Sequence, residues 1–438
     1  MGSGVLTSPF PREGDVLLAG LHRLDDLAER FGTPLYVYDL DAVEAAYRRL
    51  RAAFAGIPLD IAYSVKANGS LAVLRRLAGL GAGADIVSEG ELFRALRAGI
   101  PADRVVFAGV AKSDGEMEAA LVAGIRCFNV ESAGELRRLD AVAERLGTTA
   151  PFAIRVNPDV RSPTPHEFTR TGHAQTKFGV PAGKALDLYE WARGRAHLRA
   201  VGIDAHIGSQ IREVEPFVEA FTKLEVVLRR LREQGEDPEF LDLGGGFGVA
   251  YDPRQEAGEH GGLLDLDTLA AEVGPRIGAL GVRLVLEPGR SIAGEAGVLV
   301  TRVVDVKRSG SKVFVVVDGG MTDLIRPSHY GGYHHIEPVI SPAATVATEV
   351  VDVVGPICET GDFLAQDRPL TVPEPGDLLA VRTAGAYGFT MASNYNARRR
   401  PAEAAVSGAR AELIRARETL EDLVRGEYMP WPASTTEP

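Results

Sequence analysis

The chain contains the stretch Asp60-Ile-Ala-Tyr-Ser-Val-Lys-Ala-Asn68, a short apolar strand that ends in a lysine. Further short strands rich in β-branched residues are expected at 84–87, 104–108, 126–130, 152–157, 202–207, 240–243 and 283–287. Amphipathic helical patterns lie between them, among them 90–98, 114–123, 132–146, 216–234 and 267–280. Strand–helix alternation repeated about eight times is typical of a (β/α)8 TIM barrel, which we predict here.

A doubly wound parallel sheet would show the same alternation, so the alternation alone does not establish closure. Polar and glycine-rich motifs follow the first, sixth, seventh and eighth expected strands. Active sites of TIM barrels lie at the C-terminal ends of the strands, where these motifs would meet. Their placement therefore favours the barrel.

The character of the sequence changes after Pro288. Valine-rich, strand-like segments at 298–306, 312–318, 348–354 and 378–383 are separated by turns rich in Gly, Pro and Asp. We predict a C-terminal all-β domain that resembles a sandwich or barrel. The expected division is a barrel over residues 36–289 and a β domain formed by residues 1–35 with 290–438.

Two local patterns predict helix positions. Ser132-Ala-Gly-Glu135 has the spacing of a capping box at the start of a helix. Residues 408–424 are expected to form one amphipathic helix near the end of the chain.

Composition limits the classes of protein that this chain can represent. Its 438 residues, 45% hydrophobic and 25% charged, are ordinary for a globular protein of two or three domains. A net charge of −12 argues against nucleic-acid binding. Two distant cysteines exclude a disulfide framework and a cysteine-rich metal site. The apolar run 16–21 is too short for a signal or membrane-spanning segment, so we expect a cytoplasmic protein that does not bind membranes.

Lys66 is the first candidate for chemistry. Burial at the end of an apolar strand can lower the pKa of a lysine and make its amine reactive toward an aldehyde. The alternative for a single lysine is a charged strand end exposed to solvent. Polar neighbours at Tyr63, Ser64 and Asn68 fit either interpretation, so the remaining motifs decide between them.

Glu287-Pro-Gly-Arg290 follows the apolar run 284–286 at the end of the last expected barrel strand. A carboxylate at this position would be partly buried and would need a cationic partner. A protonated pyridine nitrogen is one such partner, and an ion pair with Arg290 is the alternative. Arg290 itself suits a planar, bidentate contact with a phosphate or a carboxylate.

Gly244-Gly-Gly-Phe-Gly248 and His206-Ile-Gly-Ser-Gln210 also follow expected strands. Successive glycines let backbone N–H groups approach an anion closely, although a tight turn would use them equally well. They lack the spacing of a dinucleotide fingerprint or a P-loop. His206 could stack on a cofactor ring, and the alternative is a histidine satisfied within the core.

Together these motifs supply an amine, a carboxylate, an imidazole and a glycine-rich anion cradle. Pyridoxal 5'-phosphate needs a lysine for its aldehyde, backbone N–H groups for its phosphate and a carboxylate for its ring nitrogen. We therefore predict a pyridoxal-phosphate enzyme.

Turns of the second domain also carry reactive side chains. His329, His334, His335 and Glu337 could suggest a metal, but adjacent histidines on a loop make a poor closed ligand set, so no metal site is expected. Cys358 is either a reactive thiol or an inert turn residue.

With these residues in view, the chain resembles the diaminopimelate decarboxylases, in the alanine-racemase-like (fold-type III) group of pyridoxal-phosphate enzymes. The resemblance covers roughly Thr33 to Ala405. Its motifs occur in family order: YSVKAN, GADIVSEGEL, GVAKSD, KFGV, HIGSQ, DLGGGFG, EPGRS, MTDLIRP, GPICETGD and GAYGFTMASNYN. The loop 331–335 departs from the common pattern beside Tyr330 and bears on the exact substrate.

The resemblance implies a role for each matching residue. It assigns cofactor binding to Lys66, His206, Ser209, Gly244, Gly245, Gly246, Glu287, Gly289, Arg290 and Tyr387. It assigns substrate binding to Arg290, Arg326, Tyr330, Glu359 and Tyr387. It assigns catalysis to Lys66, His206 and Cys358, with Cys358 as a proton donor. Cys358 and Glu359 would reach the site from the second subunit of a homodimer with shared active sites.

The implied reaction is decarboxylation of meso-2,6-diaminopimelate to L-lysine and CO2, the last step of lysine biosynthesis. The alternative is decarboxylation of another diamino or carrier-bound amino acid, since ornithine, arginine and carboxynorspermidine decarboxylases share the architecture. Arg326 together with Glu359 favours a substrate whose distal end is zwitterionic. A racemase and a non-catalytic cofactor carrier are further alternatives.

Overall fold

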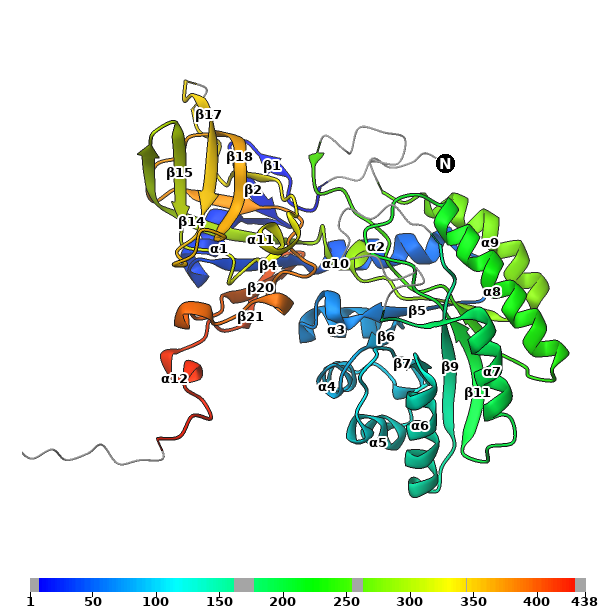
Figure 1. Ribbon diagram of the computed structural model, residues 1–438. Helices are drawn as coiled ribbons and strands as arrows, with labels where there is room; N and C mark the ends of the chain where they lie inside the picture. The colour runs from blue at the N-terminus through cyan, green and yellow to red at the C-terminus, as the bar shows by residue number, and fades with distance from the viewer. Residues whose placement is uncertain (1–7, 161–176, 254–262, 344, 430–438) are drawn as a thin grey trace, which may run out of the picture.

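The computed structural model describes residues 8–160, 177–253, 263–343 and 345–429. Figure 1 shows two lobes, a barrel wrapped by helices on one side and a part made mainly of strands on the other. Strand β4 (Leu35–Asp39) and helix α10 (Arg290–Ala293) lie where the lobes meet. No helix in these residue ranges is long and apolar enough to cross a membrane.

The first lobe is a closed barrel of parallel strands, as predicted. Its strands pair in the order β5 (Leu59–Ser64), β6 (Gly83–Ile86), β7 (Val105–Phe107), β8 (Cys127–Val130), β9 (Ala150–Asn157), β11 (Leu198–Asp204), β12 (Phe240–Asp242) and β13 (Arg283–Leu286). β13 pairs in turn with β5, with Leu286 opposite Ile61. This pairing closes the barrel and excludes the doubly wound sheet. The two-residue strand β10 (Val180–Pro181) pairs with the C-terminal end of β9.

Helices cover the barrel from outside. They are α2 (Leu40–Ala53), α3 (Leu71–Gly79), α4 (Glu89–Ala98), α5 (Asp114–Ala123), α6 (Ala133–Leu146), α7 (Ala182–Ala192), α8 (Glu215–Glu233) and α9 (Leu266–Leu280). Ser132 caps α6 by accepting from the N–H of Glu135, as its spacing indicates. The expected return contact of the capping box is absent from α6, because the Glu135 carboxylate instead accepts from Lys112 at 2.7 Å and from the N–H of Glu131 at 3.1 Å. A complete capping box occurs at Ser113, at the start of α5.

Apolar side chains from every barrel strand except β6 fill the barrel. This inner layer consists of Ala62, Val106, Cys127, Ala153, Val201, Phe240 and Val285. Phe240 is the largest of them and takes the space beside Gly202, where an added Cβ would lie 2.4 Å from its ring. The barrel is therefore packed through its centre, and its chemistry is confined to the strand ends.

The second lobe contains an extended sheet. Its strands are β14 (Gly297–Ser309), β15 (Lys312–Val317), β16 (Ile336–Pro338), β17 (Thr348–Val354), β18 (Phe363–Thr371), β19 (Leu378–Val381), β20 (Ala402–Ser407) and β21 (Arg410–Arg415). The long β14 pairs with β4, β15 and β19. Alternate residues of β4 enter different cores: Leu35 and Val37 join one, and Tyr36 and Tyr38 join the other. This two-residue period explains a sheet with an apolar core on each face.

The N-terminal segment packs onto the second lobe. It forms β1 (Arg12–Glu13), β2 (Val16–Ala19), β3 (His22–Arg23) and α1 (Leu24–Phe31). Leu17, Leu24 and Leu27 are buried in the same core as Leu35 and Val37. The apolar run 16–21 noted in the sequence thus contributes a strand to a globular core.

Strand β4 lies at the expected start of the barrel domain, residue 36, and pairs with β14 and β20 of the second sheet. One prediction about a segment is wrong. Residues 408–424 do not form one helix. β20 and β21 pair as a hairpin around Gly408, whose φ of +53° suits a tight turn, and only α12 (Leu420–Leu423) is helical.

A cluster of charges joins three strands at the N-terminal end of the barrel. Asp60 on β5 accepts from Arg126 at 2.7 Å and from both Nε and Nη2 of Arg283 at 2.8 Å. The carboxylate is partly buried, and although burial opposes its charge, the two guanidinium groups lower the pKa of Asp60 to about 2.

We expect Asp60→Asn to lower the free energy of unfolding by about 1–2 kcal/mol at pH 7, since the site is only partly buried. The pKa of Asp60 in the folded protein lies below its unfolded value, so the contribution is fully present above about pH 4 and is lost as the pH falls toward 2. Urea unfolding at pH 7 measures the difference. Glu349→Gln, which breaks an exposed pair with Arg308, is the control; equal effects of the two substitutions would contradict the prediction.

Candidate active site

Lys66 lies in a short 3-10 turn (Val65–Ala67) directly after β5. Its Nζ donates to Asp85 Oδ2 at 2.5 Å, and the Asp85 side chain is completely buried at the end of β6. Ser64 Oγ donates to the same oxygen at 2.7 Å and lies 3.0 Å from the carbonyl oxygen of Glu287. The turn is thus tied to the neighbouring strand ends on both sides.

The pKa of Lys66 moves in the direction opposite to the predicted one. Burial favours the neutral amine, but the carboxylates of Asp85 and Glu287 outweigh this effect and raise the pKa of Lys66. Lys66 is therefore a charged ammonium at neutral pH when the site holds only protein groups.

Three carboxyl groups meet beneath this lysine, at the ends of β11, β12 and β13. One oxygen each from Asp204, Asp242 and Glu287 lies within 4.8 Å of the others, and all three residues are buried. Burial, together with repulsion from the neighbouring carboxylates, raises the pKa of Glu287 well above its usual range. Burial and the charge of Asp85 raise the pKa of Asp242 to about 7. Glu287 does not pair with Arg290; its Oε1 instead accepts a long contact of 3.4 Å from Asn129. The floor of the pocket is therefore lined by carboxyl groups, and Glu287 and Asp242 keep their protons to higher pH than free carboxyl groups do.

His206 and the three glycines lie side by side. The N–H of Gly245 donates to His206 Nδ1 at 3.2 Å. Burial and the charges of Arg155 and Lys66 lower the pKa of His206 well below its usual range, so the imidazole is neutral. Added Cβ atoms at Gly245 and Gly246 would lie 1.9 Å and 2.0 Å from backbone oxygens. Only glycine fits this turn, in which the backbone can approach an anion closely and form a cradle for it. Two of its N–H groups already have protein acceptors, since Gly244 donates to Asp242 Oδ1 at 2.9 Å and Gly245 to His206.

Arg290 connects this cradle to the second lobe. It is buried, donates from Nη2 to Ser209 Oγ at 3.0 Å and donates from Nη1 to the hydroxyl of Tyr251. Its guanidinium lies over the ring of Tyr387, 4.7 Å from the centroid. Gly289, the residue before it, packs closely against Ala67. An added Cβ at Gly289 would lie only 2.8 Å from the Cβ of that alanine.

Tyr387 belongs to a loop of the second lobe that returns to the lysine turn. Its N–H donates to the carbonyl of Ala67 at 2.8 Å, and Asn68 donates to the carbonyl of Gly385 at 2.9 Å. Tyr387 has a φ of +55°, which is uncommon for a residue with a side chain. The two lobes thus meet at Lys66.

Arg326 and Tyr330 lie at the two ends of helix α11 (Arg326–Tyr330). The Arg326 guanidinium is buried over the ring of Tyr251, 4.2 Å from the centroid, and donates to His334 Nε2 at 2.5 Å. Burial and the charge of Arg290 lower the pKa of Arg326. His334 is thus an arginine partner here, and His335 lies 3.9 Å from Glu337.

Cys358 and Glu359 are placed differently from the other predicted residues. Both are exposed, in the turn between β17 and β18. The N–H of Cys358 donates to Asn396 at 2.9 Å, and the N–H of Glu359 donates to Ile357 at 2.8 Å. Asp362 holds this turn by accepting from Ile357 and Met321. Within the described residues, the hydrogen bonds of Cys358 and Glu359 are made to Asn396 and Ile357, and neither of these residues belongs to the cluster around Lys66.

Several residues of the cluster were not predicted from the sequence. Asp204 and Asp242 are the last residues of their barrel strands and Asp85 is the last but one of β6, and this position near a strand end is the signal that could have identified them. Tyr251 follows the glycine-rich motif by a few residues, and nothing in its neighbourhood predicts a contact with arginines far along the chain. His334 was considered only as a metal ligand.

The site fits pyridoxal phosphate. The glycine cradle, Ser209 and Arg290 form an anion site, and Arg290 Nε is buried without a partner among the described residues. The acidic floor offers unpartnered carboxylate oxygens on Asp204 and Asp242, which suits a pyridine nitrogen that carries a proton. The amine of Lys66 lies close enough to Glu287 of this floor to feel its charge, and it can bond the aldehyde.

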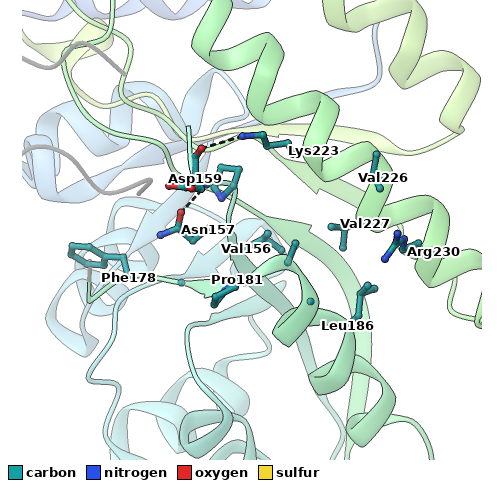
Figure 2. A pocket seen from close by; sticks show the side chains of 14 residues that line it. Val156, Asn157, Asp159, Phe178, Pro181, Leu186, Lys223, Val226, Val227 and Arg230 are labelled. Atoms are coloured by element: carbon teal, nitrogen blue, oxygen red, sulfur yellow. Dashed lines mark hydrogen bonds between the residues drawn. The ribbon is translucent and has the colours of Figure 1, made fainter. Parts of the chain in front are cut away.

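A cavity of about 470 Å³ lies elsewhere, between the end of β9, α7 and α8. Figure 2 shows its apolar wall with Lys223, which donates to the carbonyl of Asp159, and with Arg230 at its edge. None of its lining residues belongs to the predicted site. Asp159 and Phe178 flank residues 161–176, outside the described part of the chain, and we assign this cavity no role.

We expect Asp85→Asn to lower the pKa of Lys66, because the substitution removes the carboxylate that holds its ammonium. The free amine then forms at lower pH, so the rate at which cofactor-free protein captures pyridoxal phosphate rises at a lower pH than in the wild type. Stopped-flow absorbance across a pH series measures the midpoint. An unchanged midpoint would show that Asp85 does not control the lysine.

Comparison with known proteins agrees with this site. Residues 40–294 match the model of the pyridoxal-dependent decarboxylase family, pyridoxal binding domain. Diaminopimelate decarboxylases of Neisseria meningitidis serogroup B and Pseudomonas aeruginosa are 48% and 47% identical to the chain. The aligned regions cover 92% of this chain and 94% of the first relative, and 95% of this chain and 98% of the second.

Solved structures of relatives show the same fold over nearly the whole chain. Diaminopimelate decarboxylase from Helicobacter pylori, complexed with L-lysine, is 41% identical with a TM-score of 0.86, covering 92% of this chain and 98% of that one. The fold, the matched family model and the identity over more than nine-tenths of the chain agree. The chain belongs to the pyridoxal-dependent decarboxylases, within the diaminopimelate decarboxylase family, and its cofactor is pyridoxal 5'-phosphate.

Proposed function

We propose that this enzyme decarboxylates meso-2,6-diaminopimelate to L-lysine and CO2, as the last step of lysine biosynthesis. The observation that carries the proposal is a second buried guanidinium, Arg326, held beside Arg290 at the rim of the cofactor site. A substrate with a carboxylate at each end needs a cation for the end that does not react. The identity of 48% to a diaminopimelate decarboxylase supports the same assignment.

Pyridoxal phosphate, when bound, supplies an aldehyde for the substrate amine and a conjugated ring that accepts the electron pair left by CO2. Lys66 would provide the amine that bonds the aldehyde. Glu287, whose pKa is raised by burial and by its acidic neighbours Asp242 and Asp204, would keep a proton at the pyridine nitrogen. The imidazole of His206, which its lowered pKa keeps neutral, would lie against the ring face and add no charge there.

The phosphate group would be held by the glycines at 244–246 and by Ser209 and Arg290. Tyr387, whose ring lies against Arg290, would contact both the cofactor and the substrate. Arg326 and Tyr330 would bind the distal carboxylate of the substrate. Each of these groups is fixed by contacts within the protein before a ligand arrives, so little ordering is required on binding.

We further propose a homodimer with shared active sites. Cys358 and Glu359 are exposed and make their own-chain contacts away from Lys66, so they are available to a second subunit. Cys358 would return a proton to the carbon that has lost CO2, and Glu359 would bind the distal ammonium of the substrate. We also propose that the enzyme acts in the cytoplasm, where amino-acid biosynthesis takes place.

The assay that tests this function supplies purified protein with pyridoxal phosphate and meso-diaminopimelate and follows CO2 and lysine. Parallel reactions contain ornithine, arginine or carboxynorspermidine, the substrates of the alternative decarboxylases. We expect lysine from diaminopimelate and no comparable turnover of the others. Bound cofactor with inert diaminopimelate would leave the site intact and overturn the substrate assignment.

Replacing Arg326 by Ala should raise KM for diaminopimelate by at least about tenfold, because a charge-assisted contact with the distal carboxylate is lost. A diamino acid whose distal end is a simple amine should show no comparable change in KM. Steady-state kinetics on both substrates provide the measurement. An equal change for both would contradict the role of Arg326.

Mixing Lys66→Ala and Cys358→Ala subunits should restore activity that neither variant has alone. If each site combines Lys66 of one chain with Cys358 of the other, about half of the dimers are mixed and each carries one intact site, which gives about a quarter of wild-type activity. Activity is measured after exchange of subunits at equal concentration. Two active homodimers, or a mixture that stays inactive while size measurements show exchange, would contradict shared sites.

A further inference from the structure

Two aromatic side chains, Tyr251 and His334, pack against the arginines of the proposed substrate carboxylate site. Tyr251 accepts from Arg290 through its hydroxyl and presents its ring to Arg326 at 4.2 Å. His334 meets the same ring edge-on, with centroids 5.0 Å apart. Two like-charged guanidinium groups are thus held on one tyrosine, and one of them also rests on a histidine.

The contacts of His334 determine its tautomer. Its Nδ1 lies 2.8 Å from the carbonyl oxygen of Arg382, which can only accept, so Nδ1 carries the hydrogen. Nε2 is therefore a lone pair that accepts from Arg326 Nη1 at 2.5 Å. His334 is completely buried, and burial together with the charge of Arg326 lowers its pKa well below the usual range. The imidazole stays neutral and can remain an acceptor across the physiological pH range.

The backbone around His334 is fixed independently of any substrate. Its carbonyl accepts from Arg368 at 2.7 Å. The N–H of Arg382 donates to the carbonyl of His335 at 2.8 Å, and its Nε donates to Glu337 at 2.7 Å. The sheet therefore sets the direction of the imidazole, and the imidazole in turn sets that of the guanidinium.

Gly332 leaves room on the other side of Arg326. An added Cβ at Gly332 would lie 3.3 Å from Arg326 Nη2, and the N–H of Gly332 donates to the carbonyl of Arg326 at 3.1 Å. The loop at residues 331–335 thus wraps the arginine closely. One edge of the guanidinium is committed to His334, and the glycine keeps the space beside the other edge open.

We propose that His334 is a positioning residue that aims the guanidinium of Arg326 at the distal carboxylate of the substrate. The inference rests on the proposed function, since it assumes that Arg326 binds that carboxylate. His334 does not touch the reacting atoms. It acts on affinity for ligands that carry the distal carboxylate and leaves the loss of CO2 unaffected.

The test compares three single variants. Two of them replace His334 by an amide that imitates one or the other ring nitrogen, and the third is a control. In His334→Asn the amide takes the place of Nδ1 and retains the donor to Arg382, but no acceptor reaches Arg326. In His334→Gln the longer side chain places an oxygen near Nε2 and restores that acceptor. His335→Asn alters the neighbouring histidine, which contacts Glu337 and not Arg326, and serves as the control.

We expect His334→Asn to raise KM for diaminopimelate about tenfold while kcat stays within about twofold, because ground-state and transition-state binding of the distal carboxylate weaken equally. His334→Gln should recover much of the KM, and His335→Asn should match the wild type. Inhibition gives a second reading. L-Lysine retains the distal carboxylate and cadaverine lacks it. His334→Asn should therefore raise the inhibition constant of L-lysine about tenfold and change that of cadaverine little.

The outcomes separate this inference from the proposed function. A wild-type enzyme that does not decarboxylate diaminopimelate overturns the function itself. If the wild type is active and Arg326→Ala raises KM, but His334→Asn keeps wild-type KM and L-lysine inhibition, the positioning role is overturned alone. Equal loss for L-lysine and cadaverine, or failure of His334→Gln to recover KM while melting temperature and cofactor content are normal, also overturns it.

Discussion

Closure of the barrel between β13 and β5 is the constraint on which the site depends. Leu286 pairs with Ile61, so the residues that follow these two strands, Glu287 and Lys66, meet although they are far apart in sequence. Ser64 bonds both Asp85 and the backbone of Glu287, which fixes the seam at its C-terminal end. An open sheet would separate the first strand from the last and would leave the amine and the acid without each other.

The site buries carboxyl groups and the ammonium of Lys66 together, and each would be costly to bury without the other. Isolated carboxylates at the ends of β11, β12 and β13 would be costly to bury, and they remain partly protonated when no cation is present. The ammonium of Lys66 pairs with Asp85, and its charge also favours the ionised form of Glu287 in this cluster. The same acidity that keeps Lys66 charged prepares the floor of the site for a pyridine nitrogen that carries a proton. Stability and chemistry thus rest on one set of buried groups.

The second lobe contributes to this site through its loops, while its sheet provides rigidity. Tyr387 and Gly385 bond directly to the lysine turn, and Arg326 rests on Tyr251 of the barrel. The arginines are therefore oriented by groups from both lobes. This division explains why the residues proposed to select the substrate are distant in sequence from those proposed to bind the cofactor.

The sequence by itself determined the alternation of strands and helices and the motifs at the strand ends, because periodicity and glycine spacing are local properties. It favoured a barrel, and the pairing of β13 with β5 in the tertiary structure established the closure. It also pointed to Lys66, His206 and Glu287, which directly follow recognisable strands. Only the tertiary structure decided that Asp85 raises the pKa of that lysine and that His334 holds an arginine, because both effects depend on contacts between distant segments. The hairpin at residues 402–415 was missed for the same reason: its pairing with β4, rather than its helical periodicity, sets its conformation.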